Sequence, residues 1–172
     1  IKLKSFMTLS LNYSNSSILD VRIYRSILNM LNLFNHSSGC NMPHLTIEYS
    51  KNIEENINVC DLVKVMHDIA ADIDALPLGG LRTRAVARKD FLIADGHDDN
   101  TFVNVALRIA PGRSDSVKKD AGERLFNALS KFFEPFWQTD PIALSFEIQE
   151  LDAELRWKKS NIREHMKARS EA

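Results

Sequence analysis

The chain has 172 residues, of which 44% are hydrophobic and 26% are charged, and its formal net charge is −1. This length and composition are typical of one globular domain that can bury a core. A net charge so close to zero gives no general attraction to nucleic acid or to an anionic membrane. No apolar run approaches the ~20 residues that span a bilayer. We therefore expect neither a nucleic-acid-binding nor a membrane protein.

The composition changes near residue 42 and divides the chain. Residues 1–41 hold four basic residues and one acidic residue, whereas the remainder is more acidic than basic and contains all five prolines. Three interpretations of the first segment are open: a basic targeting peptide, an extra helix with apolar spacing over 18–34, or upstream sequence ahead of a true start at Met42. The break in composition, with Ile1 in first place, favours the third. We expect a non-native extension or disordered leader, followed by a domain over 42–172.

The first elements of this domain follow from periodicity. Residues 44–49 alternate between apolar and polar side chains, which predicts a strand. Residues 59–75 have helical spacing, with Asn58 as the expected N-cap. Pro77 ends this helix, and alternation over 81–88 predicts a second strand. That strand directs to one side the side chains of Arg82, Arg84, Val86 and Arg88.

A second set of elements repeats the same order. Residues 95–100 are rich in Asp, Asn and Gly and predict a turn. The segment 101–109 alternates as a strand, and 114–136 has helical spacing with Ser114 as its cap. The segment 142–151 predicts a last strand, with its apolar side chains buried. A polar tail follows, with a short helix over 162–167.

The order β-α-β followed by β-α-β predicts the fold class. Each helix is long enough to cross over and make the two strands of its half parallel. We expect an α+β subunit in which two helices cover one face of a four-stranded sheet. Apolar residues occupy parts of both strand faces, and oligomerisation is the simplest way to cover the other one.

Several motifs in the second part of the chain resemble one family. They are Met42-Pro43-His44, PLGGLRTR over 77–84, ADGHDDNTFVNVALRIAPGRS over 94–114, AGERLF over 121–126 and ALSFEIQELD over 143–152. Together, and in this order, they resemble the 5-carboxymethyl-2-hydroxymuconate isomerases of the tautomerase superfamily. The resemblance covers essentially all of 42–172.

This resemblance implies a tautomerase-like β-α-β-β-α-β subunit that assembles as a homotrimer. It implies a cytoplasmic enzyme that uses neither a metal nor a cofactor. Its substrate would be a small carboxylate, a hydroxymuconate dienol that is ketonised during the breakdown of homoprotocatechuate. Two alternatives stay open: a sister tautomerase acting on another enol acid, and a non-catalytic trimeric binding protein.

Pro43 is the expected catalytic base. An N-terminal proline carries a secondary amine, and a free α-amino group has a pKa near ~8 that burial or a nearby cation lowers. Inside a chain, the same nitrogen belongs to a tertiary amide and has no basicity. Pro43 is therefore the base only if residues 1–42 are absent or removed.

Two arginines are candidates for binding the substrate. The resemblance implies that Arg82 and Arg113 bind substrate, and an arginine fork suits a planar carboxylate. Arg113 also lies just before a predicted helix, where backbone N–H groups favour anions. The alternative for each is ordinary: a surface ion pair for Arg82 and a turn for Arg113. We expect replacement of either arginine to leave the fold intact, because a pocket arginine holds the substrate and not the core.

His44 directly follows the expected base and is a candidate pocket residue, with an ordinary strand histidine as the alternative. Arg84 and Arg88 share the strand face of Arg82 but carry no assigned role. The acidic turn over 95–100 invites a metal site, yet no ligand spacing typical of zinc or calcium appears there. We therefore predict no metal site.

Overall fold

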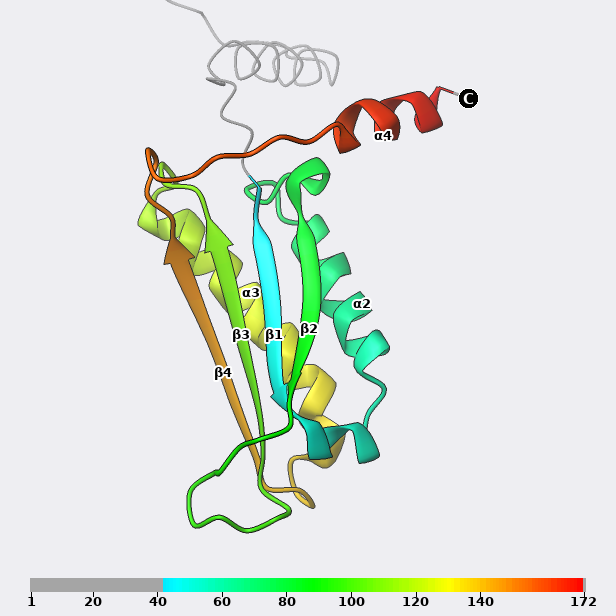
Figure 1. Cartoon of the computed structure of the whole chain (residues 1–172), viewed down its shortest axis with the longest axis vertical. Helices are drawn as coiled ribbons and strands as arrows, with labels where there is room; N and C mark the ends of the chain where they lie inside the picture. The colour runs from blue at the N-terminus through cyan, green and yellow to red at the C-terminus, as the bar shows by residue number, and fades with distance from the viewer. Residues whose placement is uncertain (1–41, 172) are drawn as a thin grey trace, which may run out of the picture. The chain divides into compact units, whose positions relative to one another are not determined.

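The structure, a computed structural model, describes residues 42–171. The extension over 1–41, including the helix expected within 18–34, lies outside the described residues. Figure 1 shows the arrangement of the elements. In chain order they are β1 His44–Ser50, η1 Lys51–Glu55, α2 Val59–Ala71, η2 Leu78–Gly80, β2 Arg82–Arg88, β3 Thr101–Ile109, α3 Asp115–Phe133, η3 Glu134–Phe136, β4 Ile142–Glu150 and α4 Ile162–Ser170.

The four strands form one mixed sheet in the order β2-β1-β3-β4. β1 pairs with β2 in parallel, β3 pairs with β4 in parallel, and the central pair β1 and β3 is antiparallel. Each parallel pair is joined through a helix, α2 in the first half and α3 in the second. In Figure 1, α3 crosses behind the strands and α2 lies to the right of β2, and both helices pack against the same core. The predicted topology and layers are therefore confirmed: a β-α-β-β-α-β subunit with two helices on one face of the sheet.

The hydrophobic core lies between the sheet and these two helices. Alternate residues of the central strands point into it, and all are fully buried: Leu45, Ile47, Val103, Val105 and Leu107. The helices contribute residues at helical spacing: Leu62, Met66 and Ala70 from α2, and Ala121, Leu125, Leu129 and Phe133 from α3. Burying each large apolar side chain stabilises the fold by roughly 1.5–3 kcal/mol.

The helix boundaries test the sequence predictions. Both expected caps are present: the Asn58 side chain accepts a hydrogen bond from Cys60 N at 2.9 Å, and Ser114 Oγ accepts one from Val117 N at 3.4 Å. The expected helix over 59–75 is too long, because α2 ends at Ala71. Beyond it the backbone turns, with Leu76 N donating to Ile73 O at 2.7 Å. Both of these side chains are buried, so the turn carries them into the core and they do not extend the helix.

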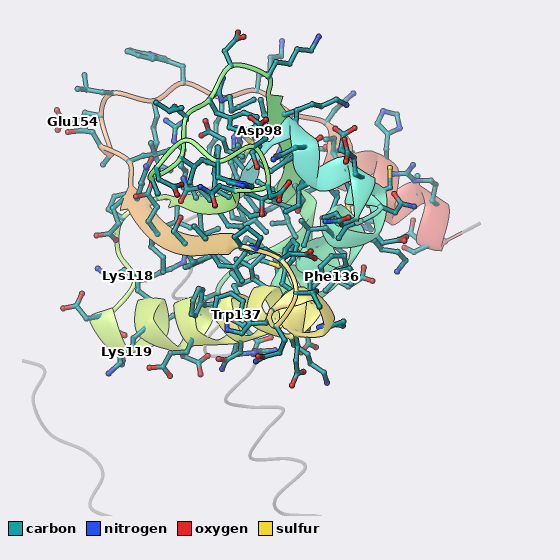
Figure 2. The ribbon with its side chains drawn as sticks, turned by 90° about the horizontal axis from the view of Figure 1, so that it is seen from below. Asp98, Lys118, Lys119, Phe136, Trp137 and Glu154 are labelled. Atoms are coloured by element: carbon teal, nitrogen blue, oxygen red, sulfur yellow. The ribbon has the colours of Figure 1, made fainter. Side chains whose placement is uncertain are left out.

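The last strand is less buried than the sequence predicts. The helix-facing residues of β4 are half-buried, because β4 is an edge strand and α3 covers it in part. Figure 2 shows α3 running from Lys118 and Lys119 near its start to Phe136 and Trp137 just beyond its end. The predicted helix in the tail is present as α4, one turn longer than expected.

The face of the sheet that carries no helix is more polar than the sequence suggests. Its members, alternating with the core residues, are His44, Thr46 and Glu48 on β1, Arg82, Arg84, Val86 and Arg88 on β2, Phe102, Asn104, Ala106 and Arg108 on β3, and Ala143, Ser145, Glu147 and Gln149 on β4. We call this the open face. Exposed apolar surface is found instead beside β4, where Phe126 and Trp137 are 40% and 54% exposed.

Opposite faces of one strand give a matched test of this packing. Ile47→Ala removes a fully buried side chain from β1 and should lower the free energy of unfolding by about 2–5 kcal/mol, because it leaves a cavity. The neighbouring Thr46→Ala, on the open face, should change it by less than about 0.5 kcal/mol. Urea unfolding at one fixed protein concentration measures both. Equal effects would contradict the assignment of the two faces.

Candidate active site

Pro43 lies immediately before β1, at the edge of the sheet where both parallel strands of the first half begin. Its side chain is buried, and its carbonyl accepts a hydrogen bond from Arg82 N at 3.0 Å. The register then pairs His44 with Arg82. The parallel pairing therefore brings together three of the four candidate residues, from positions almost 40 apart in sequence.

Arg82 is held by its own turn. Its Nη1 donates to Gly80 O at 2.7 Å, and the side chain is half-buried. The turn before it, η2, is covered by α4: a Cβ at Gly79 would lie 2.6 Å from Cγ of Arg163. Glycine at position 79 is what allows α4 to pack this closely. A guanidinium has five N–H groups, so Arg82 keeps donors for a ligand after binding Gly80.

His44 is surrounded by arginines. The sheet register places it between Arg82 on one side and Arg108 on the other, and Nη1 of Arg84 lies 3.5 Å from its Nδ1. Burial, and then the positive charges of Arg84, Arg82 and Arg108, lower the pKa of His44 below its ordinary value. The neutral form of His44 is therefore favoured.

Arg113 has a different environment. Its Nε and Nη2 donate to Ala75 O at 2.9 and 2.7 Å, and its Nη1 donates to Ala110 O at 2.8 Å. These bonds connect the turn after α2 to the turn after β3. Burial lowers the pKa of Arg113, the nearby Glu150 opposes this effect, and Arg156 adds to it. Within residues 42–171, no hydrogen bond joins Arg113 to Pro43, His44 or Arg82, so it braces the surrounding turns.

The other arginines on the open face are not equivalent. Arg88 forms an ion pair with Glu48 on the neighbouring strand. In the described part of the chain, Arg84 and Arg108 have no carboxylate within salt-bridge distance. The sequence did not single out Arg108. Alternation over 101–109 puts it on the face opposite Val103, but only the antiparallel register shows that it lies beside His44.

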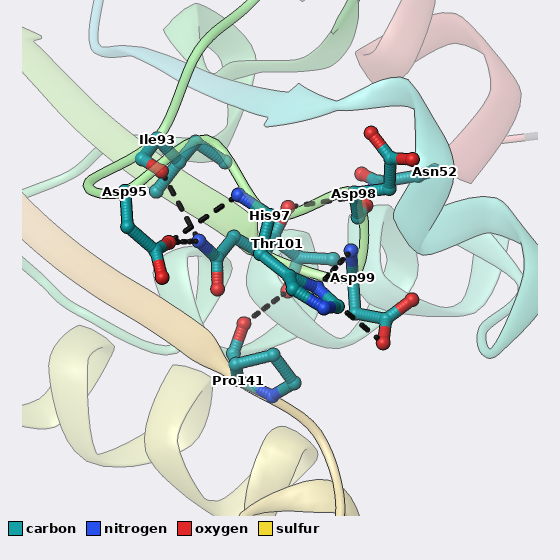
Figure 3. A network of polar contacts seen from close by, with 9 residues as sticks. Asn52, Ile93, Asp95, His97, Asp98, Asp99, Thr101 and Pro141 are labelled. Carbon is teal, nitrogen blue, oxygen red and sulfur yellow. Dashed lines mark hydrogen bonds and ion pairs between the residues drawn. The ribbon is translucent and has the colours of Figure 1, made fainter.

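The acidic turn is held together by its own hydrogen bonds, which Figure 3 shows. The Asn100 side chain donates to Ile93 O and to Asp95 Oδ1, and the Asn52 side chain donates to the carbonyls of Asp98 and Asn100. No group of three or more potential metal ligands occurs among the described residues. No helix in that part of the chain is long and apolar enough to cross a membrane.

Comparison with known proteins places this geometry in a family. The family model of 5-carboxymethyl-2-hydroxymuconate isomerase matches residues 43–166. The chain belongs to the 5-carboxymethyl-2-hydroxymuconate isomerase family. It is therefore an isomerase of the tautomerase superfamily, as the sequence motifs indicated.

Relatives support this assignment over almost their whole length. The 5-carboxymethyl-2-hydroxymuconate Delta-isomerase of Escherichia coli is 35% identical over 121 residues, which are 70% of this chain and 96% of the relative. A crystal structure of a 5-carboxymethyl-2-hydroxymuconate isomerase from Deinococcus radiodurans R1 is 35% identical, with a TM-score of 0.68 over 73% of this chain and 95% of that one. A further 5-carboxymethyl-2-hydroxymuconate delta-isomerase structure, 27% identical, gives a TM-score of 0.67 over 73% and 93%.

The hydrogen bonds of Arg113 mean that replacing this residue should lower the stability of the isomerase. Arg113→Ala removes the donors for two carbonyls and should lower the free energy of unfolding by about 1–3 kcal/mol. This differs from the expectation that the fold would be unaffected. Arg124→Ala, which breaks an exposed ion pair with Asp72, is the control and should cost less than about 1 kcal/mol. Thermal or urea unfolding compares them, and an Arg113→Ala protein as stable as the wild type would contradict the bracing role.

Proposed function

We propose that this isomerase ketonises 5-carboxymethyl-2-hydroxymuconate in homoprotocatechuate catabolism, with the free N-terminal amine of Pro43 as its base. The observation that carries this proposal is the coincidence of three things at one residue. The family match begins at Pro43, and strand β1 begins directly after it. The backbone N–H of Arg82 donates a hydrogen bond to the carbonyl of Pro43.

The reaction is a proton transfer within one molecule. The amine of Pro43 removes the proton of the enol hydroxyl, and the negative charge spreads over the oxygen and the conjugated carbons of the dienolate. The protonated amine then returns the proton to a carbon, by a 1,3 or 1,5 shift, and the oxygen becomes a ketone. One O–H bond breaks and one C–H bond forms, so no other reactant is consumed.

The surroundings of Pro43 suit this base. Arg82, Arg84 and Arg108 already lower the pKa of the adjacent His44, and their positive charges would act in the same direction on a free amine at position 43. Burial of the Pro43 side chain would lower the pKa of that amine further. An amine with a lowered pKa is neutral near pH 7 and can accept a proton.

The arginines have separate roles in this proposal. Arg82 binds a carboxylate of the substrate and stabilises the charge of the dienolate. Arg113 holds the turns around the site, and its two remaining N–H groups are available to a second carboxylate. His44 lies beside Pro43 as a neutral side chain.

We assign the active form as a homotrimer. Support comes from the exposed apolar side chains beside the edge strand β4, together with the half-buried Leu144, Phe146 and Ile148. A monomer would leave this apolar surface in water. The substrate is a trianion that does not cross a bilayer unaided, so we place the enzyme in the cytoplasm, where catabolic intermediates are formed.

The free amine is tested by comparing two forms of the protein. Protein beginning at Pro43, obtained by removal of Met42 after translation, should be active. Protein that keeps residues 1–42 should be slower by about 10²- to 10⁴-fold, the usual contribution of a general base, because its Pro43 nitrogen is an amide. Ultraviolet absorbance of the dienol follows turnover, and mass spectrometry verifies each N-terminus.

Two results would redirect the proposal. Equal activity with residues 1–42 in place would exclude Pro43 as the base. Protein that begins at Pro43 and converts another enol acid, but not this dienol, would identify a sister tautomerase.

The role of Arg82 is tested against a matched arginine of the same strand and face. Arg82→Ala should lower kcat/KM by roughly 30- to several-thousand-fold, since losing a charged partner of a buried carboxylate costs about 2–5 kcal/mol. Arg88→Ala should stay within about threefold of wild type, because Arg88 pairs with Glu48. Sedimentation velocity should show the same trimer for all three proteins. Loss of activity in Arg88→Ala alone would refute the assignment.

A further inference from the structure

Four basic side chains gather at the Pro43 end of the open face. His44 and Arg82 are the first residues of β1 and β2, and Arg108 is the last but one of β3. Arg84 reaches back along β2 to within 3.5 Å of His44 Nδ1. Like charges repel, so an anion bound among the three arginines would relieve their mutual repulsion.

The described part of the chain provides a carboxylate for Arg88 but none for the group of four basic side chains. Arg88 lies on the same strand and face as Arg84, and Glu48 of β1 neutralises it. Within residues 42–171, no carboxylate lies at salt-bridge distance from Arg82, Arg84 or Arg108. Arg82 is partly satisfied by Gly80 O, whereas Arg84 and Arg108 are exposed. Their charges are therefore available to something outside the chain.

His44 completes an anion-binding group without adding charge. A guanidinium can only donate hydrogen bonds, so the contact with Arg84 makes Nδ1 of His44 the acceptor and leaves its proton on Nε2. A neutral imidazole in this form can donate that N–H to an anion. The neutral state is favoured by burial and by the three arginines, which lower the pKa of His44.

The position of the group selects its ligand. It adjoins Pro43 through His44 and contains Arg82, so an anion bound there lies next to the proposed reaction site. Adjacent strands are about 4.8 Å apart, so Arg82 and Arg108, on either side of β1, are separated by roughly 10 Å at the backbone. Flexible side chains can close this distance onto two carboxylates of one small molecule. 5-Carboxymethyl-2-hydroxymuconate has three carboxylates, one more than hydroxymuconate itself.

We propose that Arg84, Arg108 and His44 form a subsite for a further carboxylate of the substrate and make the enzyme prefer tricarboxylates to dicarboxylates. This inference rests on the proposed function and adds a specificity-determining group to it. Arg82 holds the carboxylate nearest the proline, and the subsite binds another carboxylate beside it on the open face. Both lie at the rim where strands β1 and β2 begin, so a ligand can reach them from the edge of the sheet.

The kinetic test compares two substrates that differ in one carboxylate. Protein beginning at Pro43 is assayed with 5-carboxymethyl-2-hydroxymuconate and with 2-hydroxymuconate. Arg84→Gln and Arg108→Gln should each lower kcat/KM for the tricarboxylate, mainly through KM, by at least about tenfold more than they lower it for the dicarboxylate. Arg88→Gln is the matched control and should leave both substrates within about twofold of wild type.

A binding arm does not depend on catalysis. The chain that retains residues 1–42 is titrated with propane-1,2,3-tricarboxylate and with glutarate, by calorimetry and by NMR of His44. The tricarboxylate should bind more tightly than glutarate and raise the pKa of His44, because a bound anion stabilises the protonated imidazole. Arg84→Gln and Arg108→Gln should remove this preference, whereas Arg88→Gln should retain it.

The outcomes separate the subsite from the proposed function. An inactive wild type that still binds the tricarboxylate through Arg84 and Arg108 would refute the proposed function and support the subsite. An active wild type whose Arg84→Gln and Arg108→Gln variants keep the tricarboxylate preference would overturn the subsite alone. An equal loss for both substrates would also overturn it. Dissociation of the trimer in these variants would also overturn the subsite, because it would show that in the wild type these arginines bind a neighbouring subunit.

Discussion

The hydrogen bond from the backbone N–H of Arg82 to the carbonyl of Pro43 fixes the register on which the site depends. Parallel pairing makes β1 and β2 begin at the same edge of the sheet, so the first residue of each strand lies beside the other. A slip of one residue would turn Arg82 toward the hydrophobic core and remove it from His44. The half-buried Ala85 and Ala87 oppose that slip, because they alternate with the arginines of β2 and pack against the core. The core therefore positions the charged groups on the opposite face.

The two halves of the subunit have the same topology but different tasks. In both, a helix crosses from one strand to a parallel partner and covers the same face of the sheet. The first half carries Pro43, His44 and Arg82. The second half adds Arg108 from β3 and Arg113 from the turn after it. The antiparallel pairing of β1 with β3 joins the halves, so the proposed site combines residues of both.

The arginines differ in role because the residues around each of them differ. Arg88 is neutralised by Glu48, whereas Arg82 is oriented by a carbonyl of its own turn. Arg113 uses three donors to hold two turns together. Arg84 and Arg108 keep their charge exposed beside a neutral histidine. These differences arise from contacts between strands and turns and not from residue type, which is identical.

The sequence by itself determined the fold class and the order of its elements. Period-two alternation marked the four strands, helical spacing marked both crossing helices, and Asn58 and Ser114 marked where those helices begin. These signals are local, since each depends on side chains within a few residues. The motifs that begin at Pro43 also determined the family, because the matches are numerous and occur in order.

Tertiary structure decided the features that depend on contacts between segments distant in sequence. The end of α2 at Ala71 depends on the burial of Ile73 and Leu76, which the core and not the helix determines. The three hydrogen bonds of Arg113 join turns that lie far apart in sequence. Arg108 lies beside His44 only through the antiparallel register, because strand alternation gives a face but not a neighbour. The partner of each arginine is set by the pairing of segments that are distant in sequence. The alternation of side chains within one segment contains no information about that pairing.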